Sequence, residues 1–357
     1  MLYLKNYKVS GNINSVNRTR FRMNLIDQVK RISLQLVFLI LLTCSTRAVS
    51  DNANSSRLIL IVTSSDSPFY TPTRKAFEQS LKNSFSDNGI KVDFRKVYLT
   101  GDNSKDNHTL QTQINAHPQL ILSLGTASTV DLYNLHTSIP TLFSSILDPV
   151  SLGVVKSDKA PGSNFTGTVL LVDPGKQLET LQLADPQVKR VGVLYTNNDP
   201  TSVPFLKKAE LAATNLHISL VTEPVTTDDD IKSDLNKLNG NVDAMWIIAD
   251  PASTGAEALQ DTLSFCTARK LPILGLSGAT VHAGALISLS PNITDLGALT
   301  AEMASSIMSG NTHPATLPVR GPRATILSIN LNVANKLGIH IPSDLLHLAD
   351  DVVDSNK

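Results

Sequence analysis

Residues 58–63, LILIVT, form a short apolar run rich in β-branched side chains, and a polar loop follows them. Next comes a helical pattern in which Thr71 can cap the first turn and Pro72 suits the first helical position. Apolar side chains recur in this pattern at helical spacing, at Phe77, Leu81 and Phe85. The stretch therefore predicts a strand, a loop and a helix, which is the repeating unit of a parallel sheet covered by helices.

The same alternation of short apolar runs and helical patterns continues along the chain. The predicted strands are 58–63, 92–99, 120–124 and 141–146 in the first half, and 191–196, 220–225, 244–249 and 272–276 in the second. At 357 residues the chain exceeds the usual size of one domain, and 41% hydrophobic residues suffice for substantial cores. We expect an α/β protein of two similar lobes, each a parallel sheet wrapped by helices, with four of these strands in each sheet.

Residues 151–170 are rich in Gly, Ser and Pro, and we interpret them as the segment that connects the two lobes. Further on, 284–292 is strand-like and runs into a helical pattern over 294–310. That pattern places four apolar side chains on one face, at Leu296, Leu299, Met303 and Ile307. Extended and helical stretches over 324–353 complete the second half.

An apolar run at residues 32–44 has a basic flank before it and small residues up to Ala48 after it. This layout is typical of a secretory signal peptide, and the run is shorter than the about 20 residues that a membrane span needs. We therefore interpret 1–48 as a signal peptide, with Met23 as a better-placed start, and expect a periplasmic or cell-envelope protein. Cys44 ends a sequence similar to a lipoprotein box, so a lipid anchor at Cys44 is the alternative to cleavage near Ala48.

Removal of residues 1–48 leaves 23 basic against 30 acidic residues, a net charge near −7. Such a charge argues against a nucleic acid or an anionic membrane as the partner. Cys266 then remains as the one cysteine, so no intrachain disulfide is expected. It shares a helical stripe with Ala256, Leu259 and Leu263, and we expect it to be a buried core residue and not a reactive thiol.

The chain carries few of the patterns that support catalysis. Its eight histidines show no close metal-ligand spacing, and no CxxC pair or Gly-rich phosphate loop occurs. Residues 275–279, GLSGA, come nearest to a hydrolase signature but lack the final Gly of GxSxG. We therefore expect no catalytic residues, no metal and no cofactor, and a protein that is not an enzyme.

Small polar residues gather directly after the predicted strands. In open α/β sheets, ligands bind beyond the carboxyl ends of the strands, where helix N-termini present free N–H groups. Such loops from two lobes predict a ligand-binding cleft, although each residue taken alone fits a helix cap or a turn equally well. The candidate ligand-binding residues are Ser64, Ser65, Asp66, Ser67, Gly125, Thr126, Ser128, Asp148, Tyr195, Asn197, Asp250 and Ser277.

Several stretches in a consistent order resemble a known family. They are IPTLFSSILDPVSLGVV (139–155), GSNFTGTVL (162–170), VGVLYTNNDPTSV (191–203), DAMWIIADPA (243–252) and the two long segments 284–319 and 329–353. Residues 58–354 are similar through them to the ABC-transporter substrate-binding proteins of the tryptophan-binding type. That family is a branch of the type I periplasmic-binding-protein fold.

The resemblance implies two discontinuous lobes joined by a three-crossing hinge. Lobe 1 would comprise 58–165 and 290–318, and lobe 2 would comprise 166–289 and 319–357. The protein is then expected to be a monomer that closes on a small solute between its lobes and delivers it to an ABC permease in the inner membrane. An amino acid is the favoured solute, because family members bind aromatic amino acids among other ligands.

An amino acid carries both signs of charge, and the candidate residues offer partners for each. Thr126 and Ser128 precede a helical pattern, and a helix N-terminus favours an anion such as a carboxylate. Asp148 and Asp250 end strands in the two lobes and can accept hydrogen bonds from an ammonium group. Aromatic side chains near these loops can stack on an aromatic ligand, namely Phe69, Tyr70 and Tyr195.

Two other functions remain as alternatives. A sensor module that presents its liganded state to a signalling receptor would share the fold and lack the transporter. A hydrolase would use Ser277, or the acid pair Asp148 and Asp250, and would need a positioned base and oxyanion donors, which the sequence does not show.

Overall fold

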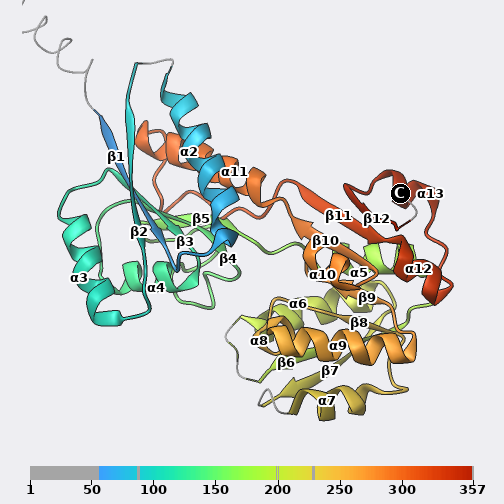
Figure 1. Cartoon of the computed structure of the whole chain (residues 1–357). Helices are drawn as coiled ribbons and strands as arrows, with labels where there is room; N and C mark the ends of the chain where they lie inside the picture. Colours follow the sequence, from blue (N-terminus) through green and yellow to red (C-terminus); the bar gives the residue numbers. More distant parts are fainter. Residues whose placement is uncertain (1–55, 87–88, 198, 200, 227–229, 356–357) are drawn as a thin grey trace, which may run out of the picture. The chain divides into compact units, whose positions relative to one another are not determined.

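The computed structural model describes residues 56–357, apart from 87–88, 198, 200, 227–229 and 356–357. The predicted signal peptide and Cys44 lie outside the described residues. Within the described part, the chain builds a five-stranded and a seven-stranded sheet, each covered by helices (Figure 1). No helix of that part is both long and apolar enough to cross a bilayer.

Lobe 1 is built on the five-stranded sheet, whose strands are all parallel in the order β2-β1-β3-β4-β5. The strands are β1 (Arg57–Thr63), β2 (Val92–Tyr98), β3 (Leu120–Leu124), β4 (Thr141–Ile146) and β5 (Phe165–Val169). The helices of this lobe are α2 (Thr71–Ser86), α3 (Asn103–Ile114), α4 (Thr126–Asn134) and α11 (Ile293–Met308).

Apolar residues fill both faces of strand β1, which lies between β2 and β3, as a parallel sheet covered on two sides requires. Ile59 and Ile61 join one core cluster with α2 and α11, whereas Leu60 and Val62 join another with α3 and α4. The predicted stripe of α2 lies in the first cluster, where Phe77 and other stripe residues are buried. The LILIVT run is therefore an inner strand of lobe 1, because its successive side chains point alternately into the two core clusters.

Helices α2 and α11 lie side by side although more than 200 residues separate them in the sequence (Figure 1). The hydroxyl of Thr73 donates a hydrogen bond to the carbonyl of Ile293 at 3.1 Å. One turn further on, Gly297 meets the backbone of α2 so closely that a Cβ atom there would lie 2.2 Å from the Thr73 carbonyl oxygen. A glycine at this position therefore permits the close packing of the two helices.

Lobe 2 is built on the seven-stranded sheet, in the order β12-β11-β10-β9-β8-β6-β7. All of its neighbouring strands are parallel except β10 and β11. The strands are β6 (Arg190–Thr196), β7 (Ser219–Val225), β8 (Ala244–Trp246), β9 (Ile273–Gly275), β10 (Ile287–Pro291), β11 (Thr325–Asn330) and β12 (Asp351–Val353). The helices are α5 (Pro174–Ala184), α6 (Ser202–Asn215), α7 (Ile231–Leu238), α8 (Pro251–Thr254), α9 (Ala256–Arg269), α10 (Gly278–Ala283), α12 (Leu331–Leu337) and α13 (Ser343–His347).

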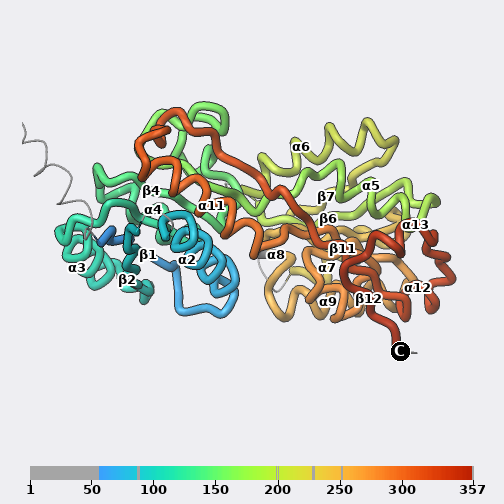
Figure 2. Tube along the Cα trace, turned by 90° about the horizontal axis from the view of Figure 1, so that it is seen from above, coloured from blue at the N-terminus to red at the C-terminus, as the bar shows by residue number. Residues whose placement is uncertain are grey.

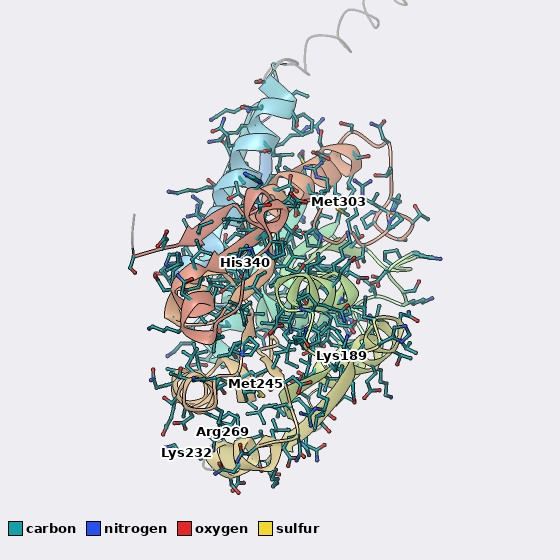
Figure 3. The ribbon with its side chains drawn as sticks, turned by 90° about the vertical axis from the view of Figure 1, so that its right-hand side faces the viewer. Lys189, Lys232, Met245, Arg269, Met303 and His340 are labelled. Atoms are coloured by element: carbon teal, nitrogen blue, oxygen red, sulfur yellow. The ribbon has the colours of Figure 1, made fainter. Side chains whose placement is uncertain are left out.

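Each lobe has its own cores. Met303 of α11 is buried in a lobe 1 cluster, and Met245 of β8 is buried in a lobe 2 cluster; both are labelled in Figure 3. The chain passes between the sheets three times, from β5 to α5, from β10 to α11, and from α11 to β11 (Figure 2). The first and third passages lie against each other, since the N–H of Val169 donates to the carbonyl of Arg320 at 3.0 Å.

The eight predicted strands all form, although the predicted strand over 244–249 ends at Trp246. The interpretation of 151–170 as a connecting segment is wrong in its last part, because Phe165–Val169 forms β5 at the edge of the lobe 1 sheet. The Gly, Ser and Pro residues just before β5 favour a loop, although β5 itself is almost fully buried. With β5 in the first sheet and β10, β11 and β12 in the second, the sheets hold five and seven strands instead of four each.

The predicted burial of Cys266 is confirmed, and desolvation raises the pKa of its thiol to about 12. Its helical stripe differs from the expected one, because Ala256 is exposed at the start of α9. Ala258 and Phe265 are buried in its place. Since Ala256 lies in the first turn, it precedes the part of α9 that packs on the core.

Candidate functional site

A cleft of about 700 Å³ lies at the carboxyl ends of parallel strands from both lobes. This volume is within the range of about 300–1,000 Å³ that is common for small-molecule sites. We define the cleft by its lining residues, which are Thr126, Leu147 and Leu152 of lobe 1, and Asp199, Thr201, Ala249, Asp250, Thr254 and Gly255 of lobe 2. Two of the predicted ligand-binding residues, Thr126 and Asp250, are among them.

The wall formed by lobe 1 includes the N-terminus of α4. Gly125 precedes this helix with φ of 99°, and a Cβ atom there would lie 2.5 Å from both Ser64 Oγ and Tyr70 Oη. Glycine is therefore needed for the backbone conformation and for the approach of two polar side chains. Gly125 has no side chain with which to cap α4, and exposed Thr126 begins the helix at the cleft.

Ser128 lies behind this wall and is fully buried. Its backbone N–H donates to Ser64 Oγ at 2.9 Å, and its hydroxyl lies 2.8 Å from Ser123 Oγ. Its hydroxyl also donates to the carbonyls of Leu124 and Gly125, each at 3.1 Å. The structure thus places Ser64 and Ser128 together as supports of the Gly125 turn.

The other residues of the first predicted loop lie around a short 3₁₀ helix, η1 (Pro68–Tyr70). Ser67 caps this helix by accepting a hydrogen bond from the N–H of Phe69 at 3.3 Å, whereas Ser65 and Asp66 are exposed. None of Ser65, Asp66 and Ser67 is among the lining residues of the cleft. Their contact with a ligand stays a prediction.

Asp148 follows β4 and shapes the loop after it. Its Oδ1 accepts hydrogen bonds from the N–H groups of Val150 and Ser151 at 3.1 and 3.0 Å. Its Oδ2 accepts a hydrogen bond from the Ser151 hydroxyl at 2.8 Å. The carboxylate remains half-buried next to Leu147, which lines the cleft.

Asp199 supplies a carboxylate from the wall formed by lobe 2. Its Oδ1 accepts hydrogen bonds from the N–H groups of Thr201 and Ser202 at 2.9 and 2.7 Å and from the Thr201 hydroxyl at 2.7 Å. Burial alone would raise the pKa of Asp199, but these hydrogen bonds outweigh burial and lower the pKa below its ordinary value. Asp199 is therefore ionised at neutral pH, and its Oδ2 has no donor among the described residues.

Asp250 also lines the cleft, but its carboxylate is engaged by the protein. Both of its oxygens lie 3.0 Å from the N–H of Thr196, and Oδ1 also accepts a hydrogen bond from the Thr196 hydroxyl at 2.8 Å. The N–H of Ala252 donates to Oδ1 at 2.7 Å. Only 1% of Asp250 is exposed, so its main visible role is to join the end of β6 to the start of α8.

The remaining predicted residues lie outside the cleft lining. Tyr195 is half-buried and packs against a core cluster of lobe 2, and Asn197 is exposed. Ser277 precedes α10, where its carbonyl accepts a hydrogen bond from the Thr280 hydroxyl at 2.6 Å. His282 Nε2 lies 3.0 Å from Asp351 Oδ2, so this histidine is paired with a carboxylate and not with Ser277.

A smaller cavity of about 50 Å³, which we call the hinge recess, opens beside the cleft. The two share Leu147, Thr201 and Ala249 as lining residues, so the recess adjoins the cleft. Its other lining residues are Asp148, 170–172, Ser202, Phe205, Lys208, Ile248 and Leu276. Residues 170–172 belong to the first passage of the chain from lobe 1 to lobe 2.

The sequence-based list of candidates missed several lining residues, notably Asp199 and Thr201. A usable signal was present, because an Asp two or three residues before a helical pattern is typical of a helix start. The apolar lining residues Leu147, Leu152 and Ala249 carried no such signal. In the sequence alone, an apolar residue that follows a strand and faces a cleft has the same pattern as one that is buried in a core.

Comparison with known proteins gives a consistent result. The family model described as ABC transporter substrate binding protein matches residues 67–353. A tyrosine-binding protein of Clostridioides difficile (strain R20291) is 24% identical over 265 residues, which cover 74% of this chain and 75% of that protein.

Solved structures agree with the family model. An ABC domain in complex with L-Trp from Streptococcus pneumonia is similar with a TM-score of 0.66 and 27% identity, covering 84% of this chain and 100% of the other. A ligand-free, open substrate-binding protein with adhesive properties from Clostridium difficile has a TM-score of 0.69 and 24% identity, covering 84% and 99%. The predicted type I periplasmic-binding-protein fold is confirmed, and with the family model spanning most of its length, the chain belongs to the ABC transporter substrate-binding protein family.

Proposed function

We propose that this protein binds an amino acid with an aromatic side chain in the cleft and delivers it to the permease of an ABC importer. One observation carries the choice of an amino acid: the cleft has a helix N-terminus on one wall and an ionised carboxylate on the other. A zwitterion satisfies both. Relatives named for tyrosine binding and solved with L-Trp support an aromatic side chain.

The carboxylate of the ligand would bind at the start of α4. Thr126 is exposed there and lines the cleft, and Ser64 Oγ accepts the N–H of Ser128, so the N–H groups of Thr126 and Ala127 are the ones left for a ligand. Backbone N–H groups in the first turn of a helix lack intrahelical partners, and the helix dipole adds a partial positive charge. Both effects favour an anion at this position.

The ammonium group would bind opposite, at Asp199. Its Oδ1 is held by the start of α6, which fixes the carboxylate and leaves Oδ2 for a ligand. Asp148 at the hinge recess is a second acceptor, and it stays a prediction as a direct contact. Asp250 is less suited, because both of its oxygens are engaged by Thr196 and only 1% of the residue is exposed.

The protein would release the ligand chemically unchanged. The hydrolase alternative needs a base next to Ser277, and His282 is instead paired with Asp351. The acid pair Asp148 and Asp250 lacks a free second carboxylate, since Asp250 is saturated by Thr196 and Ala252. These contacts favour binding without turnover.

Titration calorimetry of the mature protein with the twenty amino acids tests this proposal. We expect an aromatic amino acid to bind, with Asp199→Asn weakening it roughly 10- to 100-fold, as a charged hydrogen bond worth about 1.5–3 kcal/mol predicts. Asp102→Asn is the matched control, because Asp102 caps α3 through the N–H groups of Ser104 and Lys105 in the same way but outside the cleft. Absence of any amino-acid binding would overturn the ligand class, and equal affinities of Asp199→Asn and wild type would overturn the role of Asp199.

A further inference from the structure

We propose that the hinge recess is a specificity subsite, in which Ser202 exchanges a hydrogen bond with a hydroxyl group at the far end of the ligand's side chain. The inference rests on the proposed function, since it takes an aromatic amino acid as the ligand of the cleft. It adds the chemical class of that side chain, a hydroxyphenyl group, and the residue that selects it.

Ser202 has an unusual environment for a polar side chain. It is the first residue of α6 and is 2% exposed, and its hydroxyl makes no hydrogen bond of regular geometry with a described residue, although it lies near enough to the Asp199 carboxylate to contribute to the lowered pKa of Asp199. Its backbone N–H is held by Asp199 at 2.7 Å, so the position of the side chain is fixed by the start of the helix. A buried hydroxyl without a partner carries a desolvation penalty, which a ligand atom in the recess can relieve.

The other walls of the recess are mainly apolar. Leu170, Phe205, Ile248 and Leu276 line it, and Phe205 is itself held by an edge-to-face contact with Trp246 at 5.4 Å between ring centroids. Such walls suit the carbon edge of an aromatic ring, and one polar group is placed to form a hydrogen bond with the substituent at the end of that ring. The recess is therefore lined like a pocket that orients an apolar group by a single hydrogen bond.

The other polar residues of the recess are less suited to this role. The hydroxyl of Thr201 is donated to Asp199 at 2.7 Å, and Asp148 accepts three hydrogen bonds from its own loop. Lys208 is exposed and lies at the solvent side of α6. Ser202 is thus the buried hydroxyl of the recess that remains available to a ligand.

The size of the recess decides how much of a ligand enters it. A cavity of about 50 Å³ is too small for a whole ring, since an apolar cavity that binds benzene measures about 150 Å³. The tip of a ring fits if the rest lies in the cleft, which adjoins the recess at Leu147, Thr201 and Ala249. A phenol hydroxyl is such a tip, and it can both donate to and accept from Ser202 Oγ.

The test compares tyrosine with phenylalanine, which differ by that hydroxyl alone. We expect wild type to bind L-Tyr at least about tenfold more tightly than L-Phe, because a site that hydrogen-bonds a ligand hydroxyl discriminates against the analogue without it. Ser202→Ala should reduce this ratio to below about threefold, mainly through weaker binding of L-Tyr. Alanine keeps the backbone hydrogen bond to Asp199 and suits the first turn of a helix, so the fold should survive.

Ser288→Ala is the matched control. Ser288 is also a fully buried serine without a partner for its hydroxyl among the described residues, but it lies in β10 away from the cleft and the recess. Its ratio of affinities should equal that of wild type. An unchanged ratio in a folded Ser202→Ala protein would overturn the inference, as would a wild type that binds L-Phe as tightly as L-Tyr. If no aromatic amino acid binds wild type, the proposed function itself fails.

Discussion

Thr196 donates both its backbone N–H and its hydroxyl to the carboxylate of Asp250, at 3.0 and 2.8 Å. Asp250 is buried and also receives the N–H of Ala252, so one carboxylate joins the end of β6 to the start of α8. Asp250 and Thr254 line the cleft. The interaction therefore stabilises the fold where lobe 2 forms a wall of the cleft.

Replacing this carboxylate should destabilise the protein. Asp250→Ala leaves the N–H groups of Thr196 and Ala252 without acceptors, and we expect the free energy of unfolding to fall by about 2–3 kcal/mol. Thr196→Val keeps the backbone hydrogen bond and removes the hydroxyl, which donates to Asp250 and accepts a long hydrogen bond from the N–H of Ala252, and should cost about 1 kcal/mol. Urea unfolding of both variants and of the double variant measures this, and the two effects should be less than additive. A stable Asp250→Ala protein with weakened binding would instead assign Asp250 to the ligand.

Asp250 also shows what the sequence can and cannot predict about the site. The predicted strand over 244–249 leads into Asp-Pro-Ala, which places a carboxylate beyond the carboxyl end of a strand. In the structure β8 ends at Trp246, and Asp250 lines the cleft. The partner of that carboxylate depends on Thr196, which lies 54 residues away in the sequence. Capping of a neighbouring loop and contact with a ligand need the same residue type, so a single sequence does not separate them.

The fold was more predictable than the site for a physical reason. Buried parallel strands such as Leu120–Leu124 are apolar throughout, and the stripe of α11 repeats at helical spacing. Both patterns are local. β5 was missed because an edge strand with a central Gly167 lacks a continuous apolar run. Ser202 was missed because the absence of a partner for its hydroxyl is a property of the folded chain alone.

Gly297 should be required for the packing of α2 on α11. A Cβ atom there would lie 2.2 Å from the Thr73 carbonyl oxygen and 3.0 Å from the Ala76 Cβ, and backbone cannot move aside as a side chain can. We expect Gly297→Ala to lower the free energy of unfolding by about 1–3 kcal/mol, despite the higher helix propensity of alanine. Thermal unfolding measures the change. Thr294→Ala, at an exposed position of the same helix, should have little effect, and equal stability of the two variants would contradict the close contact.

Cys266 should make the stability of the mature protein depend on alkaline pH. Its folded-state pKa is raised from 9.0 to about 12 by burial, so the folded protein retains the thiol proton more firmly than the unfolded chain. The stabilisation is complete below pH 9 and is lost as pH rises towards 12. Urea unfolding at pH 8 and pH 10.5 should show a larger loss for wild type than for Cys266→Ala. Parallel losses in the two proteins would show that the thiol titrates normally.

The N-terminus should be removed on export. The apolar run over residues 32–44 and its basic flank fit a secretory signal, and they precede the part of the chain that forms the two sheets. Intact-mass analysis and N-terminal sequencing of protein from the cell envelope should give a first residue at Val49, or a lipid-modified Cys44. Recovery of the full-length chain from the cytosol would contradict export.

Ligand binding should rotate the two lobes about the three passages of the chain. Each lobe has its own cores, and the passages after β5, after β10 and before β11 are short relative to the lobes they join, so rotation leaves internal packing intact. Arg323, near the end of the third passage, is paired with Asp295 and Glu302 of α11 at 2.8 Å each, which links that passage to lobe 1. Small-angle scattering should show a smaller radius of gyration when the amino acid identified by calorimetry is added at saturation. Asp199→Asn at the same ligand concentration should be only partly liganded, so its radius should fall less than that of wild type. An unchanged radius in saturated wild type would show that the lobes form a rigid scaffold.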